Sequence, residues 1–224
     1  MKTLWIVANW KSNKTIAEAL DWVGQVGPKL IHKPGIQVVV CPTFLAAEEV
    51  KKVVMVGHFP LLVGVQDLSP FEEGPFTGEE AARILSDVVD LAILGHSERR
   101  QNFGETDQMV AQKVAQALKY NIKPLVCVQG PDTPVPPGVK LVAYEPLFAI
   151  GTGHPEDPVN ASQVARQLKE RVDTSLQVLY GGSVTGENVG SFLSVENLSG
   201  LLVGGASLDP QQFGRIVQSA YETN

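Results

Sequence analysis

Three ionisable side chains of complementary chemistry stand within three residues of short apolar runs: Lys11, His96 and Glu145. A carboxylate such as Glu145 can remove a proton from carbon, and a neutral imidazole such as His96 can donate a hydrogen bond to a carbonyl oxygen. The ammonium of Lys11 can stabilise the negative charge that then develops. Together these groups indicate acid–base chemistry on a small molecule, of the kind that interconverts an aldose and a ketose through an enediolate.

Three glycine-rich turns could bind an anion: Gly151-Thr152-Gly153, Gly181-Gly182-Ser183 and Gly204-Gly205-Ala206. Glycine lets backbone N–H groups approach an anion closely, and the last two turns open onto short helical segments whose positive ends add to the attraction. A single Gly-Gly turn is usually only a boundary between elements. Three such turns after successive strands predict a phosphate site.

Each charged candidate also has a purely structural interpretation. Lys11 and Glu98 would be solvated surface charges, His96 would cap the helix that follows it, and Glu145 would be a solvated carboxylate before a proline. These interpretations are reasonable for each residue taken separately. The convergence of four ionisable groups beside an anion site favours the catalytic interpretation.

Spacing disfavours two other kinds of chemistry. The four histidines are far apart in the sequence, and neither an H-x-x-x-H nor a C-x-x-C pair is present. A serine hydrolase is disfavoured because Ser183 lies in a glycine turn and no G-x-S-x-G occurs. We therefore expect a mechanism without a metal or a cofactor.

Eight short apolar runs predict the strands that must position these groups. Each run is continuous rather than alternating, which is typical of strands buried on both faces of a parallel sheet. The runs are residues 4–8, 37–41, 61–65, 91–94, 122–128, 140–144, 177–180 and 200–203. The candidate residues follow the carboxyl ends of these runs, where α/β barrels carry their chemistry.

Segments with helical periodicity and helix start signals lie between most of the runs. Three of them begin at Thr15, at Thr43, and at Thr77, which is followed by Glu79-Glu80. Two more run from Glu105 through Lys119 and from Asp157 through Val172. Alternating strands and helices predict an α/β protein, and eight strands fit a closed (β/α)8 barrel. An open doubly wound sheet is the alternative, but Ala8-Asn9-Trp10-Lys11 stands where such a sheet usually carries G-x-G-x-x-G.

The segment between the fifth and sixth runs departs from this pattern. It contains Pro131, Pro134, Pro136 and Pro137, and no helix survives that density of prolines. We predict that the helix between strands five and six is missing. The apolar barrel surface there must then be covered by the proline-rich segment or by another subunit.

Composition and charge restrict the setting. The chain has 224 residues, of which 44 % are hydrophobic and 19 % charged, and a net charge of −6. This composition fits a globular chain that buries a large core and has no general attraction to nucleic acid or to a membrane surface. No run reaches the ~18 apolar residues of a membrane span, and the first run is too short for a signal peptide.

The two cysteines, Cys41 and Cys127, lie in or beside apolar runs, as reduced buried thiols do. No shift in composition divides the chain. We therefore expect a cytoplasmic protein with one domain over residues 1–224.

Five motifs occur in order along almost the whole chain. They are Ala8-Asn9-Trp10-Lys11, Gly95-His96-Ser97-Glu98-Arg99-Arg100, Tyr144-Glu145-Pro146 with Ala149-Ile150-Gly151-Thr152-Gly153, Tyr180-Gly181-Gly182-Ser183, and Val203-Gly204-Gly205-Ala206-Ser207-Leu208. They closely resemble motifs of the triosephosphate isomerase family. The resemblance implies a TIM barrel that interconverts dihydroxyacetone phosphate and D-glyceraldehyde 3-phosphate in glycolysis and gluconeogenesis.

The resemblance also implies roles for individual residues. Glu145 would be the base, His96 the neutral electrophile, and Lys11 the electrostatic stabiliser. Asn9 would position the substrate and Lys11, and Glu98 would contact Lys11. The phosphate would be held by backbone N–H groups of Gly151, Ser183, Gly204 and Gly205.

Residues 74–79 resemble the family's dimerisation loop, in which the threonine reaches toward the partner's active site. The resemblance therefore implies a homodimer in which Phe76 and Thr77 form part of the contact. The missing fifth helix is similar to that of compact family members, some of which are tetramers, so a tetramer is the alternative.

The lid and its far hinge contain two departures from the family pattern. Residues 146–153 would close over the phosphate, but Phe148 stands where the family usually has Trp, and His154 stands where Lys is usual. Phe148 and the missing fifth helix motivate a second hypothesis, a non-catalytic phosphate-binding barrel that acts as a sensor or scaffold. An isomerase for a larger phosphosugar is disfavoured by the short lid.

Overall fold

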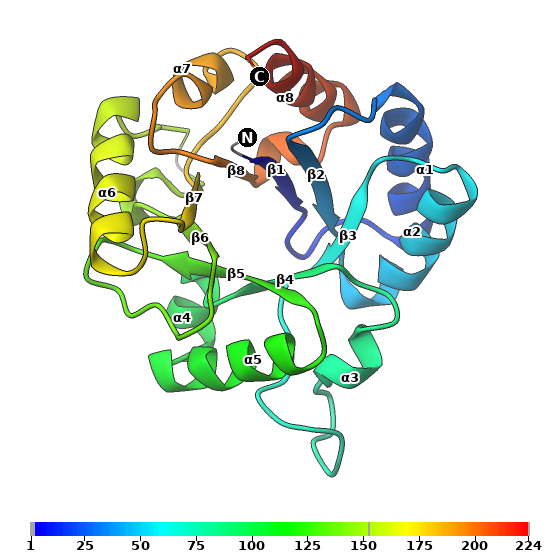
Figure 1. Cartoon of the computed structure of the whole chain (residues 1–224). Coiled ribbons are helices and arrows are strands. Elements are labelled where there is room, and N and C mark those ends of the chain that lie inside the picture. Colours follow the sequence, from blue (N-terminus) through cyan, green and yellow to red (C-terminus); the bar gives the residue numbers. More distant parts are fainter. Residues whose placement is uncertain (1–2, 152, 224) are drawn as a thin grey trace.

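A computed structural model describes residues 3–151 and 153–223 of the chain. Within them, eight parallel strands form a closed barrel in which each strand pairs with its neighbours in sequence and β1 pairs with β8. The strands are β1 (Leu4–Asn9), β2 (Ile36–Cys41), β3 (Leu62–Val65), β4 (Leu91–Leu94), β5 (Lys123–Val128), β6 (Leu141–Tyr144), β7 (Gln177–Tyr180) and β8 (Gly200–Val203). Figure 1 shows them as a central ring surrounded by helices, which confirms the predicted (β/α)8 barrel.

Alternate residues of each strand face two different cores. Trp5 and Val7 of β1 belong to a cluster inside the barrel, whereas Ile6 and Ala8 belong to the layer between the strands and the helices. Successive side chains of a strand point to opposite faces, so a strand between two cores must be apolar throughout. Asn9 continues the inward-facing set to the carboxyl mouth of the barrel.

The outer layer consists of helices and single helical turns. In the described residues these are α1 (Ile16–Val26), α2 (Phe44–Val56), α3 (Ala82–Leu85), α4 (Ser97–Phe103), α5 (Asp107–Lys119), α6 (Pro158–Arg171), α7 (Val189–Leu193), α8 (Pro210–Thr223), and the turns η1 (Gly27–Lys29), η2 (Leu147–Ala149) and η3 (Gly205–Ser207). None of these helices is long and apolar enough to span a membrane. The helix expected from Glu105 begins two residues later because Thr106 caps it by accepting the N–H of Met109.

The prediction of a helix that begins at Thr77 is wrong. Residues 77–81 form a turn and extended chain, and α3 is a short helix that begins only at Ala82. The sequence Thr77-Gly78-Glu79-Glu80 has the spacing of a capping box, but Gly78 adopts a φ of 91°. That left-handed conformation is incompatible with the first turn of a right-handed helix.

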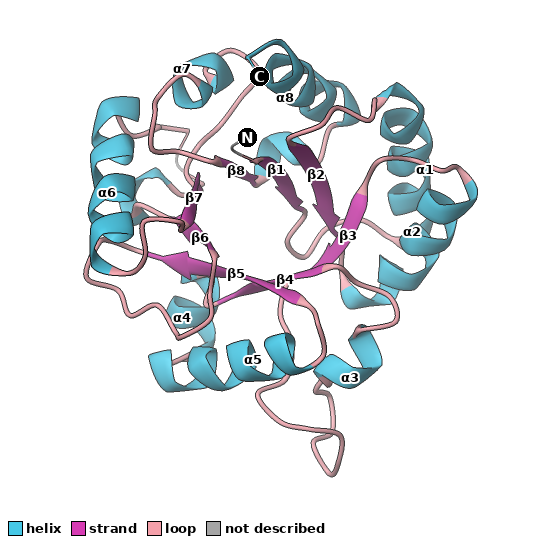
Figure 2. Cartoon of the chain, viewed as in Figure 1, coloured by secondary structure: helices cyan, strands magenta, loops and turns pink. Residues whose placement is uncertain are grey.

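The connection between β5 and β6 confirms the predicted missing helix. Residues 129–140, all of which the structure describes, contain no helix and appear in Figure 2 as a loop. The outward side chains of the two strands, Val126 and Val142, are nevertheless fully buried, and Val139 of the connection is 3 % exposed. Arg171 at the end of α6 donates to the carbonyl oxygen of Thr133 (2.5 Å). The proline-rich segment therefore covers the barrel within the chain.

Candidate active site

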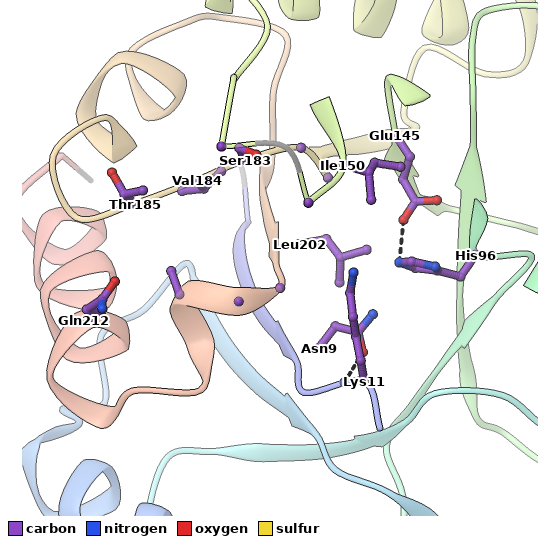
Figure 3. A pocket seen from close by; sticks show the side chains of 17 residues that line it. Asn9, Lys11, His96, Glu145, Ile150, Ser183, Val184, Thr185, Leu202 and Gln212 are labelled. Atoms are coloured by element: carbon purple, nitrogen blue, oxygen red, sulfur yellow. Dashed lines mark hydrogen bonds and ion pairs between the residues drawn. The ribbon is translucent and has the colours of Figure 1, made fainter. Parts of the chain in front are cut away.

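A cavity of about 330 Å³ opens at the carboxyl ends of the strands. It is lined by loops that follow β1, β4, β6, β7 and β8, the end of the barrel at which the sequence predicted a site. Figure 3 shows Glu145 and His96 pointing toward one another on one side of the cavity. The cavity brings together eight residues singled out from the sequence: Asn9, Lys11, His96, Glu145, Gly151, Ser183, Gly204 and Gly205.

The carboxylate of Glu145 is buried at this mouth. Leu141 and Ala143 of β6 point into the barrel, so the next inward position is Glu145, which is only 1 % exposed. Its Oε2 accepts the backbone N–H of Ser97 (2.9 Å), and its Oε1 lies 2.9 Å from His96 Nε2. A buried carboxylate held by two donors is a preorganised proton acceptor.

His96 can serve both as a helix cap and as a hydrogen-bond donor to substrate, because each role uses a different ring nitrogen. Nδ1 accepts the backbone N–H of Glu98 (3.2 Å), so His96 is the N-cap of α4. An accepting nitrogen carries no proton, so the hydrogen-bond pattern assigns the proton to Nε2, which donates to Glu145. The ring is thus a neutral imidazole whose Nε2–H can be offered to a substrate oxygen.

The backbone of Lys11 has a left-handed conformation, with a φ of 54°. Its N–H donates to Asn9 Oδ1 (3.0 Å), and its carbonyl oxygen accepts from Gln66 Nε2 (2.8 Å). The ammonium group forms an ion pair with Glu98. Glu98 lines a neighbouring cavity of about 300 Å³ rather than the main one, and it contacts Lys11 from that side.

The sequence did not single out three groups that lie beside the catalytic candidates. Two are uncharged side chains, and the third is a backbone N–H. Gln66 is the first residue after β3, and its position at a strand end was the available signal. The Cys127 thiol points into the barrel from β5, where burial and the nearby Glu145 raise its pKa. The contribution of Ser97 is its N–H, which no pattern of residue types reveals.

Ser183, the last residue of the second glycine turn, lies on the other side of the cavity from Glu145 and His96 (Figure 3). Both glycines of that turn have a steric reason to be present. A Cβ at Gly182 would lie 2.2 Å from the Tyr180 hydroxyl, and one at Gly181 would lie 3.0 Å from Glu145 Cγ. Thr152, in the middle of the first turn, lies outside the described residues.

The expected dimer loop lies away from this cavity. Figure 1 shows the connection between β3 and α3 protruding from the barrel. Within it, Phe71 and Phe76 stack with ring centroids 4.3 Å apart, and Phe76 is 37 % exposed. Thr77 is also exposed.

In the part of the chain that the structure describes, no group of three or more histidine, cysteine, aspartate or glutamate side chains could hold a metal ion. The polar groups at the mouth are instead donors and acceptors for an organic anion: a carboxylate, a neutral imidazole, an ammonium and several backbone turns.

Comparison with known proteins agrees with this site. The family model described as triosephosphate isomerase matches residues 4–134 and 138–220. Proteins named triosephosphate isomerase from Alkaliphilus oremlandii (strain OhILAs) and Aquifex aeolicus (strain VF5) are 35 % and 34 % identical to the chain. These alignments cover 95 % and 96 % of this chain, and 97 % and 98 % of the relatives. A barrel with this mouth, matched over nearly its whole length, belongs to the triosephosphate isomerase family.

Proposed function

We propose that this chain interconverts dihydroxyacetone phosphate and D-glyceraldehyde 3-phosphate as a cytoplasmic enzyme with one barrel domain over residues 1–224. The observation that carries the proposal is the contact between Glu145 Oε1 and His96 Nε2 (2.9 Å) inside a cavity of about 330 Å³. It joins a proton acceptor and a neutral donor in a space that fits a small phosphorylated sugar. Neither a metal nor a cofactor is needed for this chemistry.

The proton transfer follows from these positions. Glu145 removes a proton from the carbon next to the carbonyl group, and the electron pair of that C–H bond forms the double bond of an enediolate. The negative charge on the former carbonyl oxygen is stabilised by His96 Nε2–H and by the ammonium of Lys11. A proton then passes, with the help of His96, from the adjacent hydroxyl group to the former carbonyl oxygen. Glu145 returns its proton to the former carbonyl carbon, so that substrate and product have the same composition.

The donor that His96 offers to substrate is the one that Glu145 occupies in the structure. A single N–H serves one strong acceptor well, so substrate binding must replace the contact between the two side chains. The carboxylate is thereby released toward the substrate carbon. Its second contact, with the backbone N–H of Ser97 (2.9 Å), must also break before Glu145 can move away from α4.

The phosphate is proposed to bind between the glycine turns, held by backbone N–H groups of Gly151, Ser183, Gly204 and Gly205. All four residues line the cavity, and Lys11 Cε lies 3.5 Å from where a Cβ of Gly204 would be. The ammonium of Lys11 can therefore approach both the phosphate and the enediolate. Asn9 contributes by accepting the Lys11 N–H, which holds this loop in place.

Residues 146–153 are proposed to act as the lid. Leu147 and Phe148 are 51 % and 63 % exposed, so this segment carries apolar surface that closure can bury. Closure would exclude water from the enediolate and disfavour loss of phosphate from it. Glu145 directly precedes the segment, so base and lid move on one stretch of backbone.

The chain is proposed to form a homodimer in which Phe76 and Thr77 of one copy enter the neighbouring cavity of the other. That cavity of about 300 Å³ adjoins Lys11 and His96, and its rim carries the exposed rings of Phe44 and Phe103. An inserted loop would cover this apolar rim and shield the back of the catalytic groups. The barrel surface beside the connection between β5 and β6 is covered within the chain, so it gives no argument for a tetramer.

The test is an initial-rate assay of glyceraldehyde 3-phosphate isomerisation, coupled to NADH-dependent reduction of dihydroxyacetone phosphate. Glu145→Gln, purified identically, is the control, and its kcat should be lower by about 10²–10⁴ while its affinity for 2-phosphoglycolate changes little. A folded wild-type chain that binds 2-phosphoglycolate without turnover would instead support a non-catalytic phosphate-binding barrel.

A further inference from the structure

Gln212 is a polar side chain of the cavity to which the proposed mechanism gives no role. It lies in the first turn of α8 and lines the cavity of about 330 Å³ together with Thr185 and Gly205. Figure 3 shows Gln212 and Thr185 on the side of the cavity away from Glu145 and His96. A triose whose reacting carbons lie beside the acid–base pair extends its phosphate group toward this side.

Packing fixes the first turn of α8 relative to the glycine turn at Gly205. Trp22 Nε1 donates to the carbonyl oxygen of Ser207 in η3 (3.0 Å), and the Trp22 ring packs against Phe213 with ring centroids 5.3 Å apart. Both aromatic side chains are buried. Gln212 directly precedes Phe213, so it is held at a defined place beside the turn.

The side-chain amide of Gln212 is available to a ligand. It is half-buried, and it forms no hydrogen bond with another residue in the part of the chain that the structure describes. The backbone N–H groups of this turn are already in use, because Asp209 Oδ1 accepts those of Gln211 (2.9 Å) and Gln212 (2.7 Å). The start of α8 therefore offers the cavity an amide side chain.

Other side-chain donors on this side of the cavity are engaged. Ser183 Oγ donates to the carbonyl oxygen of Ala149 (2.7 Å), and Thr185 Oγ1 accepts the backbone N–H of Glu187 (3.3 Å) within its own loop. Lys11 is the one cationic side chain among the described residues that line the cavity. A phosphate group has three strong acceptor oxygens, so a further N–H donor has an acceptor to meet.

We propose that the side chain of Gln212 binds the phosphate group of the substrate, by donating an Nε2–H to one of its oxygens alongside the backbone N–H groups of the glycine turns. The inference rests on the proposed function, because it adds a residue to the proposed phosphate site. Gln212 contacts the phosphate group and none of the reacting carbons. An amide can donate to a phosphate oxygen, whereas a carboxylate at the same place would repel it.

Two variants test the proposal through the affinity of the full chain for 2-phosphoglycolate and for inorganic phosphate. Gln212→Ala removes the donor and should raise both Kd values about fivefold to tenfold, as loss of a hydrogen bond to a charged group does. Gln212→Glu also adds a negative charge and should raise both by at least about tenfold. Titration calorimetry measures the first probe, and phosphorus NMR measures the second.

Inorganic phosphate identifies the group that Gln212 contacts. It has no carbon chain, so both probes should lose affinity by similar factors in each variant. In the isomerase assay, kcat/KM for glyceraldehyde 3-phosphate should fall by about the same factor, because the contact is kept in the enediolate.

Gln211→Glu is the matched control. Gln211 is the preceding residue in the same helical turn, is exposed and does not line the cavity. The variant makes the same change in net charge at the start of α8, and its Kd values should stay within about twofold of the wild type, because solvent screens an exposed charge. All variants are titrated at least 15 °C below their Tm, which separates an effect on binding from loss of folded protein.

The outcomes are distinct. Wild-type affinity for both probes in Gln212→Ala and Gln212→Glu, or an effect on 2-phosphoglycolate alone, would overturn the role of Gln212 and leave the isomerase function standing. An equal effect of Gln211→Glu would also overturn it, since charge alone would then explain the loss.

The wild-type chain separates this proposal from the isomerase function. A folded chain that binds both probes without turnover would refute the isomerase function alone, because the titrations report the phosphate site without catalysis. A folded chain that binds neither probe would refute both.

Discussion

The side chain of Gln66 holds the backbone of Lys11 in place. Its Nε2 donates to the carbonyl oxygens of Lys11 (2.8 Å) and Cys41 (3.0 Å), and so joins the ends of β1 and β2 from the end of β3. The φ of 54° at Lys11 lies in a region that costs a non-glycine residue about 1–3 kcal/mol. The strain persists because the neighbouring amide groups fix the conformation.

Replacing Gln66 by glutamate tests this relationship. Gln66→Glu removes both N–H donors and places a carboxylate against two carbonyl oxygens, so the Lys11 loop should relax. We expect kcat/KM to fall about tenfold or more, through a higher KM and a lower kcat, since Lys11 serves both bound states. Gln177→Glu is the control, because Gln177 Oε1 only accepts from Trp5 Nε1 (3.1 Å), on the interior of β1. Unchanged kinetics in Gln66→Glu would show that Lys11 needs no such support.

Sedimentation of a dimer-loop variant tests the proposed assembly. Thr77→Arg adds a long cation to the exposed tip of the loop and should convert the dimer to monomers that are much less active. Thr223→Arg changes an exposed threonine at the end of α8 in the same way and should remain dimeric. If Thr77→Arg sediments as an active dimer at micromolar concentration, residues 70–79 do not form the contact.

The reactivity of the two cysteines should report unfolding rather than surface exposure. Cys41 and Cys127 are fully buried inside the barrel, and burial raises the pKa of both thiols. The thiolate is the reactive form, so the native protein should not react with Ellman's reagent at pH 8. Both thiols should react in 6 M guanidinium chloride. Rapid labelling of one thiol in the native state would contradict the burial that the structure shows.

Loss of a buried cation should destabilise the barrel in a pH-dependent way. Lys113 is 2 % exposed, and its ammonium pairs with Asp67 (2.6 Å) and with the buried carboxylate of Glu105. Lys113→Met leaves the buried Glu105 and the partly buried Asp67 with only Arg99 as a cationic partner among the described residues, at a cost of about 3–5 kcal/mol.

The sign of the pH dependence follows from the carboxyl groups. Burial already raises the pKa of Asp67, and removal of Lys113 raises it further. Lys113→Met should therefore lose stability as pH rises through that higher pKa, so its deficit is larger at pH 8 than at pH 5 in urea unfolding. Lys119→Met, which breaks an exposed ion pair with Glu72, should change stability by less than about 1 kcal/mol. Equal deficits at both pH values would exclude this mechanism.

The alkaline limit of stability should depend on Tyr180. Burial raises the pKa of Tyr180 to about 12, whereas a tyrosine in the unfolded chain ionises near 10. The stability that the neutral form contributes is complete below pH 10 and is lost as pH rises toward 12. Tyr180→Phe should therefore flatten the decline in unfolding free energy between pH 10 and 12. If the unfolding free energy of Tyr180→Phe declines as steeply as that of the wild type, other groups cause the decline.

Much of this architecture could be predicted because the determining signals are local. Strands between two cores must be apolar throughout, so their ends, and with them Asn9, His96 and Glu145, could be placed to within a residue or two. Thr77 shows the limit, because a capping-box spacing does not reveal that Gly78 adopts a positive φ. Gln66 shows another, because an uncharged amide is recognised only when the carbonyl groups that it bonds are in view.

The proline-rich connection also bears on how the barrel assembles. With residues 129–140, it is the shortest link between consecutive strands in the described chain. A shorter link loses less conformational entropy when its ends come together, and prolines reduce the number of unfolded conformations that must be given up. Omission of the helix therefore makes β5 and β6 the strand pair that meets at the lowest entropic cost, a natural starting point for closing the ring.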